Sequence, residues 1–433
     1  MRINLNFISV IDGLNITAIL KSFSLISFAN IIKLIISFVC IKLMAIMLGP
    51  SGVALIGQLN NFVAMIMSFS GGGIMTGITK YVAENRDSEE KSKDYISTAF
   101  RITIYFSLTI GILLVLLHDF ISRKVLLSPD YGSVFILFGS TLFLYALNTM
   151  ILCLLNGYQE LRKYVMVNLS GSSIGLFLTL LLIFPFGLIG AMISIVTTQS
   201  ITFFVSCWMI RNYPWMSWSY FSGKFNKKIG LKYMRYSLMI LMSTVFNSPV
   251  LIIIRGSIIS NISMVDAGYW EGINRISGAY LSVIVAFFST YYLPNISRIN
   301  DRVMIKNEIF NLYKIIIPII VLLFIIIYLF RYVIIKILFT EDFCQMENLF
   351  LWQLLGDFVK IMTWPMFYLM LSKSMLKEFV FCESLFPVLY LFLSLYFISI
   401  YNNELWAVKS YLITNLLYML FCIFIFRKII LLK

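Results

Sequence analysis

Histidine is almost absent from this sequence, because His118 is the only one in 433 residues. The six cysteines are scattered without paired spacing, at Cys40, Cys153, Cys207, Cys344, Cys382 and Cys422. A disulfide framework and a zinc site both need clustered ligands, so we predict neither, and we expect no metal and no cofactor. A single histidine without metal-ligand spacing also leaves little basis for hydrolytic catalysis.

Charged residues are scarce as well. Only 12% of the chain is charged, whereas 60% is hydrophobic. A water-soluble core does not need so much apolar material, so the composition indicates an integral membrane protein. The apolar runs are continuous over about 20 residues, the length of a helix that crosses a bilayer, and they lack the alternation of a membrane β-barrel. The predicted fold class is therefore an all-α polytopic membrane protein.

Apolar runs bounded by charges, prolines or glycines predict twelve transmembrane helices. They lie near residues 22–48, 53–79, 95–117, 131–156, 164–185, 187–210, 233–259, 266–294, 308–330, 346–371, 379–400 and 404–426. The second run contains a glycine cluster, Gly71 to Gly73, which we interpret as a helix-packing seam or, alternatively, as a point where the helix bends.

Lysine and arginine gather on alternate connections between these spans, and such clusters mark the cytoplasmic side of a membrane protein. With a cytoplasmic N-terminus, only Arg123, Lys124, Arg331 and Lys336 fall in connections on the outer side. We therefore predict that both termini are cytoplasmic. The formal net charge of +14 is then mainly a topology signal, and we predict no binding to nucleic acid.

The longest hydrophilic connection begins at Arg211 and reads RNYPWMSWSYFSGKFNKKIGLKYMR. It divides the chain into two halves of six spans each. Because six is even, the two halves have the same orientation in the membrane. We predict an interfacial cytoplasmic segment at 1–21, an N-terminal six-helix lobe at 22–210, a cytoplasmic linker at 211–232 and a C-terminal six-helix lobe at 233–433.

Several charged residues fall inside the spans or at their edges. A charge at the centre of a bilayer costs about 2.5–3.5 kcal/mol on insertion scales, so such residues usually face a bundle interior or a wet cavity. The cations are Lys33, Lys42, Arg101, Arg255, Arg275, Lys314, Lys360 and Lys409, and the acids are Glu271, Asp357 and Glu383. Their number predicts a large polar space within the protein.

The positions of these charges suggest different roles. Lys33 lies well inside the first span without an acid one helical turn away, so it is a candidate for binding an anion, and Arg255 is similar. Glu271 and Arg275 are four residues apart and Asp357 and Lys360 three, so each pair can form along one helix and act only in packing. Four others lie close enough to a span end to extend to the membrane surface: Lys42, Arg101, Lys314 and Lys409.

An ordered set of motifs resembles one known family. The segments are KLMAIMLGPSGVALIGQLNNF, GGGIMTGITKYVAE, SLMILMSTVFNSPVLIIIR, GYWEGINRISGAYL, STYYLPNISRI and LFLWQLLGDFVK. In order and spacing they resemble the lipid-linked oligosaccharide flippases of O-antigen and enterobacterial common antigen, which belong to the multidrug/oligosaccharidyl-lipid/polysaccharide exporter superfamily. The resemblance runs from about residue 16 to the C-terminus and is weak in spans three to six.

The resemblance implies two six-helix lobes in a V around a central cavity. Its implied activity is transfer of an undecaprenyl-pyrophosphate-linked, O-antigen-type repeat unit from the cytoplasmic to the periplasmic leaflet of the bacterial inner membrane, by alternating access. The implied partners are this lipid-linked substrate, membrane lipids, and the polymerase and chain-length regulator of the same pathway.

The expected site residues follow from the same resemblance and from the buried charges. The cationic substrate-binding set is Lys33, Lys42, Arg255, Arg275 and Lys360. The candidates for ion coupling or charge pairing are Glu271, Asp357 and Glu383. Glu271 and Arg275 depart from the residues expected in the family, so we interpret them as determinants of specificity for a particular sugar.

Two other classes of protein remain open. An ion-coupled drug antiporter of the same superfamily would share the fold, but its cavity would be richer in acids than in bases. A membrane glycan polymerase would need a long periplasmic loop for its catalytic residues, and the longest outer connections here have about fifteen residues. The excess of cations in the spans favours an anionic substrate over a drug, and the short outer connections argue against a polymerase.

Overall fold

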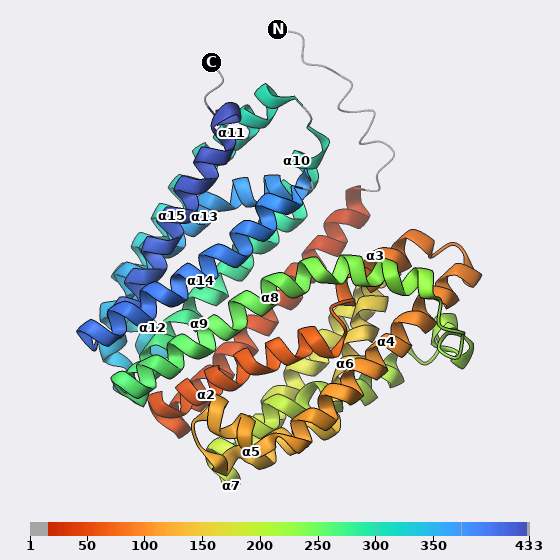
Figure 1. Ribbon diagram of the computed structural model, residues 1–433, viewed down its shortest axis with the longest axis horizontal. Coiled ribbons are helices and arrows are strands. Elements are labelled where there is room, and N and C mark those ends of the chain that lie inside the picture. Colours follow the sequence, from red (N-terminus) through yellow and green to blue (C-terminus); the bar gives the residue numbers. More distant parts are fainter. Residues whose placement is uncertain (1–15, 300, 374, 431–433) are drawn as a thin grey trace.

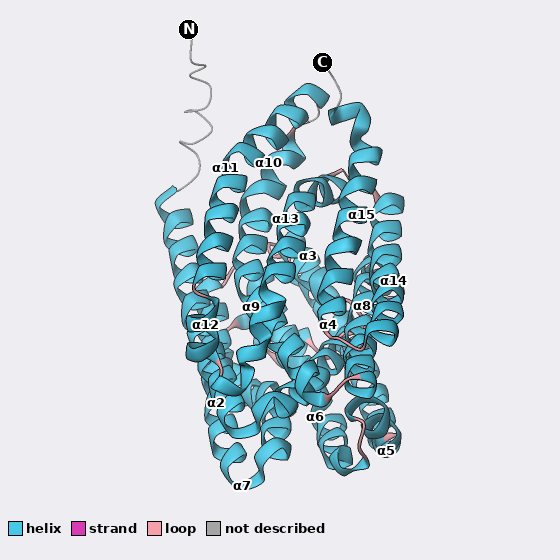
Figure 2. Ribbon diagram, turned by 90° about the vertical axis from the view of Figure 1, so that its left-hand side faces the viewer, coloured by secondary structure: helices cyan, strands magenta, loops and turns pink. Residues whose placement is uncertain are grey.

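The computed structural model describes residues 16–299, 301–373 and 375–430. These ranges contain helices and loops and no strand, as Figure 2 shows, so the predicted all-α architecture is confirmed. The predicted interfacial segment, 1–21, lies mostly outside the described residues. The long helices are α2 (Ile16–Ser70), α3 (Met75–Asn85), α4 (Glu89–Leu116), α6 (Gly132–Gly157), α7 (Leu161–Ile210), α8 (Lys227–Asn261), α9 (Met264–Phe287), α11 (Arg302–Leu329), α13 (Phe350–Ser372), α14 (Leu376–Tyr401) and α15 (Leu405–Ile430).

Short helical turns connect the long helices at both ends of the molecule. They are α5 (His118–Ile121), η2 (Ser122–Leu126), η3 (Pro129–Tyr131), η4 (Pro214–Met216), η5 (Trp218–Tyr220), η6 (Phe288–Tyr292), α10 (Leu293–Arg298), α12 (Arg331–Leu338) and η7 (Glu341–Leu349). The turns η4 and η5 belong to the hydrophilic connection after α7. Arg101 on α4 holds this connection in place by donating hydrogen bonds to the carbonyl oxygens of Ser222 and Gly223.

The helices α2 and α7 are each two spans joined at a sharp reversal, visible in Figure 1. The reversals occur at Gly49, with φ of +62°, and at Gly187, with φ of +53°. Only glycine adopts this backbone region readily, and Pro50 suits the first turn of the helix that follows. A straight helix of 55 residues would extend roughly 80 Å, far more than the bilayer core. The predicted breaks between spans one and two and between spans five and six are confirmed.

The count of twelve spans follows from these reversals. Among the described residues, eight helical stretches are long and apolar enough to cross a membrane by length and composition. Two of the eight stretches belong to α2 and α7, and each of these two contains two spans because of its reversal. The eight stretches together therefore give ten spans. The helices α8 and α9, of 35 and 24 residues, are not among the eight, and with these two the count reaches the predicted twelve.

The second span ends earlier than the sequence predicts. We expected a helix through residue 79, but α2 ends at Ser70 and α3 begins at Met75. Gly72 and Gly73 have φ of +62° and +68°, and consecutive residues in this backbone region cannot continue a right-handed helix. The glycine cluster therefore forms a turn, which is the alternative to a packing seam.

The helices form two groups that meet along α2, α8 and α9. In the first group α6 packs against both α4 and α7, and all three helices contact α2. In the second group α13, α14 and α15 pack together, and α14 also packs against α8. The two groups diverge toward the end of the molecule where α3 and α10 lie (Figure 1). This is the predicted architecture of two lobes in a V.

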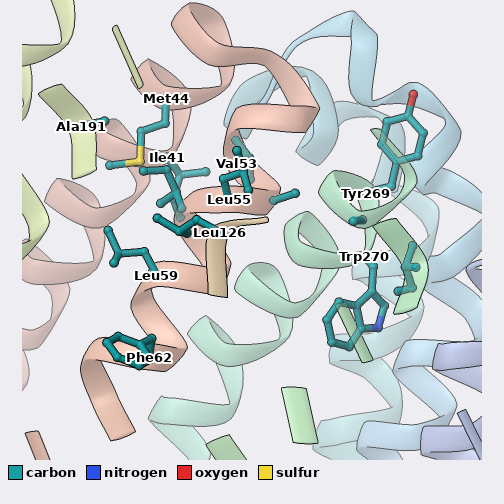
Figure 3. Packing of buried hydrophobic residues seen from close by; sticks show 14 of the residues in the cluster. Ile41, Met44, Val53, Leu55, Leu59, Phe62, Leu126, Ala191, Tyr269 and Trp270 are labelled. Carbon is teal, nitrogen blue, oxygen red and sulfur yellow. The ribbon is translucent and has the colours of Figure 1, made fainter. Parts of the chain in front are cut away.

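The groups are in close contact at the opposite end. Figure 3 shows Trp270 and Tyr269 of α9 near the turn of α2, where Ile41, Val53 and Leu55 are buried. The backbones approach closely here, because a Cβ atom on Gly268 would lie only 2.1 Å from the carbonyl oxygen of Pro50. Small residues permit such helix approaches in membranes. This contact fixes the position of α9 on α2 and brings Glu271 against α2.

Candidate functional site

A central cavity of about 350 Å³ lies between the two groups of helices. Its walls come from α2, α8, α9, α13, α14 and α15. The charged residues that line it are Arg255 on α8, Glu271 and Arg275 on α9, and Lys360 on α13. Three cations and one acid give the cavity a positive character, which favours an anionic ligand. Four of the residues expected from the sequence thus line one cavity.

Arg255 is the most buried cation of the cavity, with an exposed fraction of 2%. Its Nη1 donates a hydrogen bond to Gln58 Oε1 on α2 at 2.9 Å, and its Nη2 forms an ion pair with Glu271 on α9. The guanidinium carbon lies 5.2 Å from the ring centroid of Trp270, a distance at which a cation and an aromatic face attract each other. Arg255 therefore connects α8 to both α2 and α9.

Glu271 connects two guanidinium groups. Its Oε1 accepts a hydrogen bond from Arg275 Nε at 2.8 Å, and its Oε2 accepts one from Arg255. The Glu271 carboxylate lies directly against the backbone of α2 at Gly57. A Cβ atom at this position would lie 2.2 Å from the Glu271 carboxyl carbon, so a larger residue would displace the carboxylate. The predicted pairing of Glu271 with Arg275 is present, and Arg255 extends it to a trio. Two arginines around one acid keep a net positive charge.

Two donors of this trio remain without a hydrogen-bond partner among the described residues. They are Arg255 Nε and Arg275 Nη2, and both atoms are buried. An unsatisfied buried donor on a charged group costs free energy, which a bound anion recovers by accepting the hydrogen bond. The guanidinium groups are therefore suited to a ligand with phosphate or carboxylate oxygens.

Asp357 lies in the wall beside the cavity and is fully buried. Its carboxylate accepts hydrogen bonds from Ser277 Oγ at 2.7 Å, Gln353 Nε2 at 3.2 Å, Tyr411 Oη at 2.8 Å and the hydroxyl of Tyr280. The expected ion pair with Lys360 is not formed. The Lys360 ammonium lies instead over the Tyr411 ring, 5.5 Å from its centroid.

Three expected site residues lie away from the central cavity. Lys33 is exposed on the first half of α2. Lys42 donates hydrogen bonds to the carbonyl oxygens of Lys336, at 2.8 Å, and Phe339, so it caps the C-terminal end of α12. Glu383 is half-buried on α14. The roles of Lys33, Lys42 and Glu383 in transport stay predictions.

Several residues of the site were not expected from the sequence. Gln58 and Gln353 position the charged groups from within apolar spans, and Trp270 and Tyr411 cover the cations. The two glutamines could have been identified from the sequence, because a glutamine inside a membrane span needs a polar partner. The aromatic residues carried no such signal, since aromatic residues make up 16% of the chain.

The surroundings of Asp357 predict a measurable contribution to stability. Replacing Asp357 with asparagine leaves one acceptor oxygen for four donors and adds two donors of its own. We expect the free energy of unfolding to fall by about 1–3 kcal/mol, measured from the unfolding midpoint in detergent. The matched control is Asp87→Asn, whose side chain is 95% exposed and which should change nothing. An unchanged midpoint for Asp357→Asn would show that the four donors do not need an anionic acceptor.

Comparison with known sequences identifies related proteins. Residues 19–300 match the family described as "Polysaccharide biosynthesis protein". The Lipid III flippase of Escherichia coli (strain K12) is 26% identical over 386 residues, which cover 89% of this chain and 92% of that protein. The Lipid III flippase of Shigella flexneri matches with the same values. The resemblance noted from the sequence motifs is confirmed.

Solved structures of membrane transporters have a fold similar to that of this chain. The Lipid II flippase MurJ in an inward closed conformation has a TM-score of 0.68 and 15% identity, covering 95% of this chain and 90% of that one. An inward-facing multidrug resistance MATE family transporter of the MOP superfamily has a TM-score of 0.66 and 15% identity, covering 92% and 94%. The fold is therefore the two-lobe fold found in these membrane transporters.

Proposed function

The chain belongs to the polysaccharide biosynthesis protein family, and on this premise we propose that it is a flippase for a lipid-linked oligosaccharide. The substrate is an undecaprenyl-pyrophosphate-linked repeat unit of the O-antigen type. The protein moves its headgroup from the cytoplasmic to the periplasmic leaflet of the inner membrane. The observation that carries the proposal is the central cavity, where two buried guanidinium groups keep unpartnered donors. The named flippases among the relatives support it.

The chemistry of such a lipid explains the need for a cationic cavity. A diphosphate and hydrophilic sugars cannot cross about 30 Å of hydrocarbon unaided, because their hydration would be lost. The polyprenyl tail is apolar and stays in the lipid. Arg255 and Arg275 replace water around the diphosphate with charge-assisted hydrogen bonds. Lys360, which lines the same cavity, adds a third cation, and Lys33 is proposed to attract the anion on its way in.

The contacts between the lobes support alternating access. At one end the lobes are joined by Gly268 on Pro50, by Arg255 with Gln58, and by Lys42 with the last carbonyls of α12. At the other end, which carries α3 and α10, the lobes diverge (Figure 1). With cytoplasmic termini, this conformation opens to the cytoplasm. Transport requires the joined end to separate and the other end to close.

Further parts of the proposal concern organisation and coupling. The lobes extend over 22–210 and 233–433, with 211–232 as the cytoplasmic linker. Glu271, Asp357 and Glu383 are the acids that could couple transport to an ion, and Glu271 with Arg275 adapts the cavity to one sugar unit. The polymerase and the chain-length regulator of the pathway act on the transported product.

The proposal is tested with purified protein in liposomes. The probe is a fluorescent undecaprenyl diphosphate that carries a short oligosaccharide, and quenching by an impermeant reductant reports which leaflet holds it. We expect protein-dependent exposure of the internal pool. Absence of transfer, together with export of a fluorescent organic cation, would replace the flippase by a drug antiporter. Longer glycan chains formed from the probe would instead indicate a polymerase.

A further inference from the structure

Lys360 differs from the other two cations that line the central cavity, because its charge is not paired with an acid. Arg255 and Arg275 both form ion pairs with Glu271. Within the described ranges the Lys360 ammonium forms no ion pair and no hydrogen bond, and it lies 5.5 Å from the ring centroid of Tyr411. Its three donor hydrogens are therefore available to a ligand in the cavity.

An acid is nevertheless close to Lys360 along the chain. Asp357 precedes it by three residues on α13, a spacing at which opposite charges can pair on a helix. Such a pair would neutralise the ammonium and withdraw it from an anionic ligand. The Asp357 carboxylate is instead occupied by four donors. Three of them share Oδ2 and fix the orientation of the carboxylate: Ser277, Tyr280 and Gln353.

Tyr411 is the fourth donor, and it contacts both charged residues. Its hydroxyl donates a hydrogen bond to Asp357 Oδ1 at 2.8 Å, while its ring faces the Lys360 ammonium. The ring packs directly on the backbone of α13, since a Cβ atom on Gly356 would lie 2.6 Å from Tyr411 Cδ1. Gly356 and Lys360 are four residues apart, so they lie on one face of the helix. The Tyr390 ring packs edge-on against Tyr411, with 5.8 Å between the centroids.

We propose that Tyr411 is a positioning residue that keeps Lys360 available for the diphosphate of the substrate. The ring of Tyr411 holds the ammonium at the central cavity by cation–π attraction. Its hydroxyl occupies the Asp357 oxygen that would otherwise accept Lys360. Without this hydroxyl, Lys360 turns toward Asp357 and the diphosphate loses a donor. The inference rests on the proposed flippase function, which supplies the diphosphate.

The experiment measures binding of undecaprenyl diphosphate to the full-length protein in lipid nanodiscs. The variants are Tyr411→Phe, which keeps the ring and removes the hydroxyl, Lys360→Met, and the two combined. The matched comparison is Tyr280→Phe. It also removes a tyrosine hydroxyl from Asp357, but two donors remain at Oδ2, and Tyr280 does not line the central cavity. Tyr105→Phe is the neutral control, because Tyr105 is 68% exposed.

We expect Tyr411→Phe to weaken binding by about two- to tenfold, the effect of one lost hydrogen bond. Lys360→Met should weaken it by about ten- to a hundredfold, the effect of a lost hydrogen bond from a charged group. The combined variant should bind as Lys360→Met does, because Tyr411 acts through Lys360. Tyr280→Phe should weaken binding less than Tyr411→Phe, and Tyr105→Phe should bind as the wild type does.

Three results would overturn the positioning role while the wild-type protein still binds the lipid. Unchanged binding by Tyr411→Phe would show that the hydroxyl is not needed. Losses that multiply in the combined variant would show that Tyr411 acts on the lipid independently of Lys360. Weakening by Tyr280→Phe as large as by Tyr411→Phe would assign the effect to the surroundings of Asp357 as a whole. Failure of the wild-type protein to bind undecaprenyl diphosphate would instead refute the flippase function itself.

Discussion

Replacing Gly268 with valine is expected to prevent the chain from accumulating as folded protein in the membrane. Even the first added atom, a Cβ, would lie 2.1 Å from the carbonyl oxygen of Pro50 and 2.8 Å from its Cα. These are backbone atoms, and Gly49 with Pro50 fixes their position at the reversal of α2. No rotamer change relieves the overlap, so α9 must move away from α2. Overpacking of this kind costs about 1–3 kcal/mol or more, and here it also displaces Glu271 from Gly57.

A matched variant separates this clash from a general effect of valine in the helix. Gly278 lies on the same helix, and a Cβ atom there would meet nothing within 4 Å. Gly278→Val should therefore accumulate to normal levels and unfold near the wild-type temperature. Membrane abundance and the unfolding midpoint of the purified protein are the two measurements. Similar values for Gly268→Val and Gly278→Val would show that α9 can pack on α2 at a larger distance.

The positions of the transmembrane helices could be predicted from the sequence for a simple physical reason. A membrane helix satisfies its own backbone, so length and hydropathy alone locate it. The reversals at Gly49 and Gly187 follow from local backbone chemistry, and the break between spans was predicted at both places. The turn at Gly72 and Gly73 was only one of two alternatives from the sequence, because a run of glycines in an apolar segment is also compatible with close packing. Only the φ angles decide between the two.

The arrangement of charges was predictable only within single helices. Glu271 and Arg275 are four residues apart, so their pairing follows from helix geometry. The hydrogen bond between Arg255 and Gln58 joins residues 197 positions apart, and no local pattern encodes the register of α8 on α2. Tertiary packing also overrode one local expectation. Hydroxyl groups on α9 and α15 reach Asp357, and Lys360, which helix spacing allows to pair with Asp357, lies over the Tyr411 ring.

Arg255→Met is expected to reduce the rate of lipid-linked oligosaccharide transfer by about ten- to a hundredfold at matched protein abundance. A hydrogen bond to a charged group contributes about 1.5–3 kcal/mol, and each 1.4 kcal/mol corresponds to a factor of ten. Methionine keeps the apolar stem of arginine and leaves Glu271 paired with Arg275. The measurement is the leaflet-exposure assay in liposomes. Arg331→Met is the matched control, because Arg331 pairs with Glu347 and neither residue lines the central cavity.

A double variant decides what Arg255 does. If Arg255 only neutralises Glu271, then Arg255→Met combined with Glu271→Gln removes charge and counter-charge together and should restore transport. If Arg255 binds the diphosphate, the double variant should stay as slow as Arg255→Met, since the donor for the anion is still missing. We expect the second outcome, because Arg275 already supplies Glu271 with a counter-charge and Arg255 Nε remains unpartnered among the described residues. Restored transport in the double variant would limit Arg255 to a structural role.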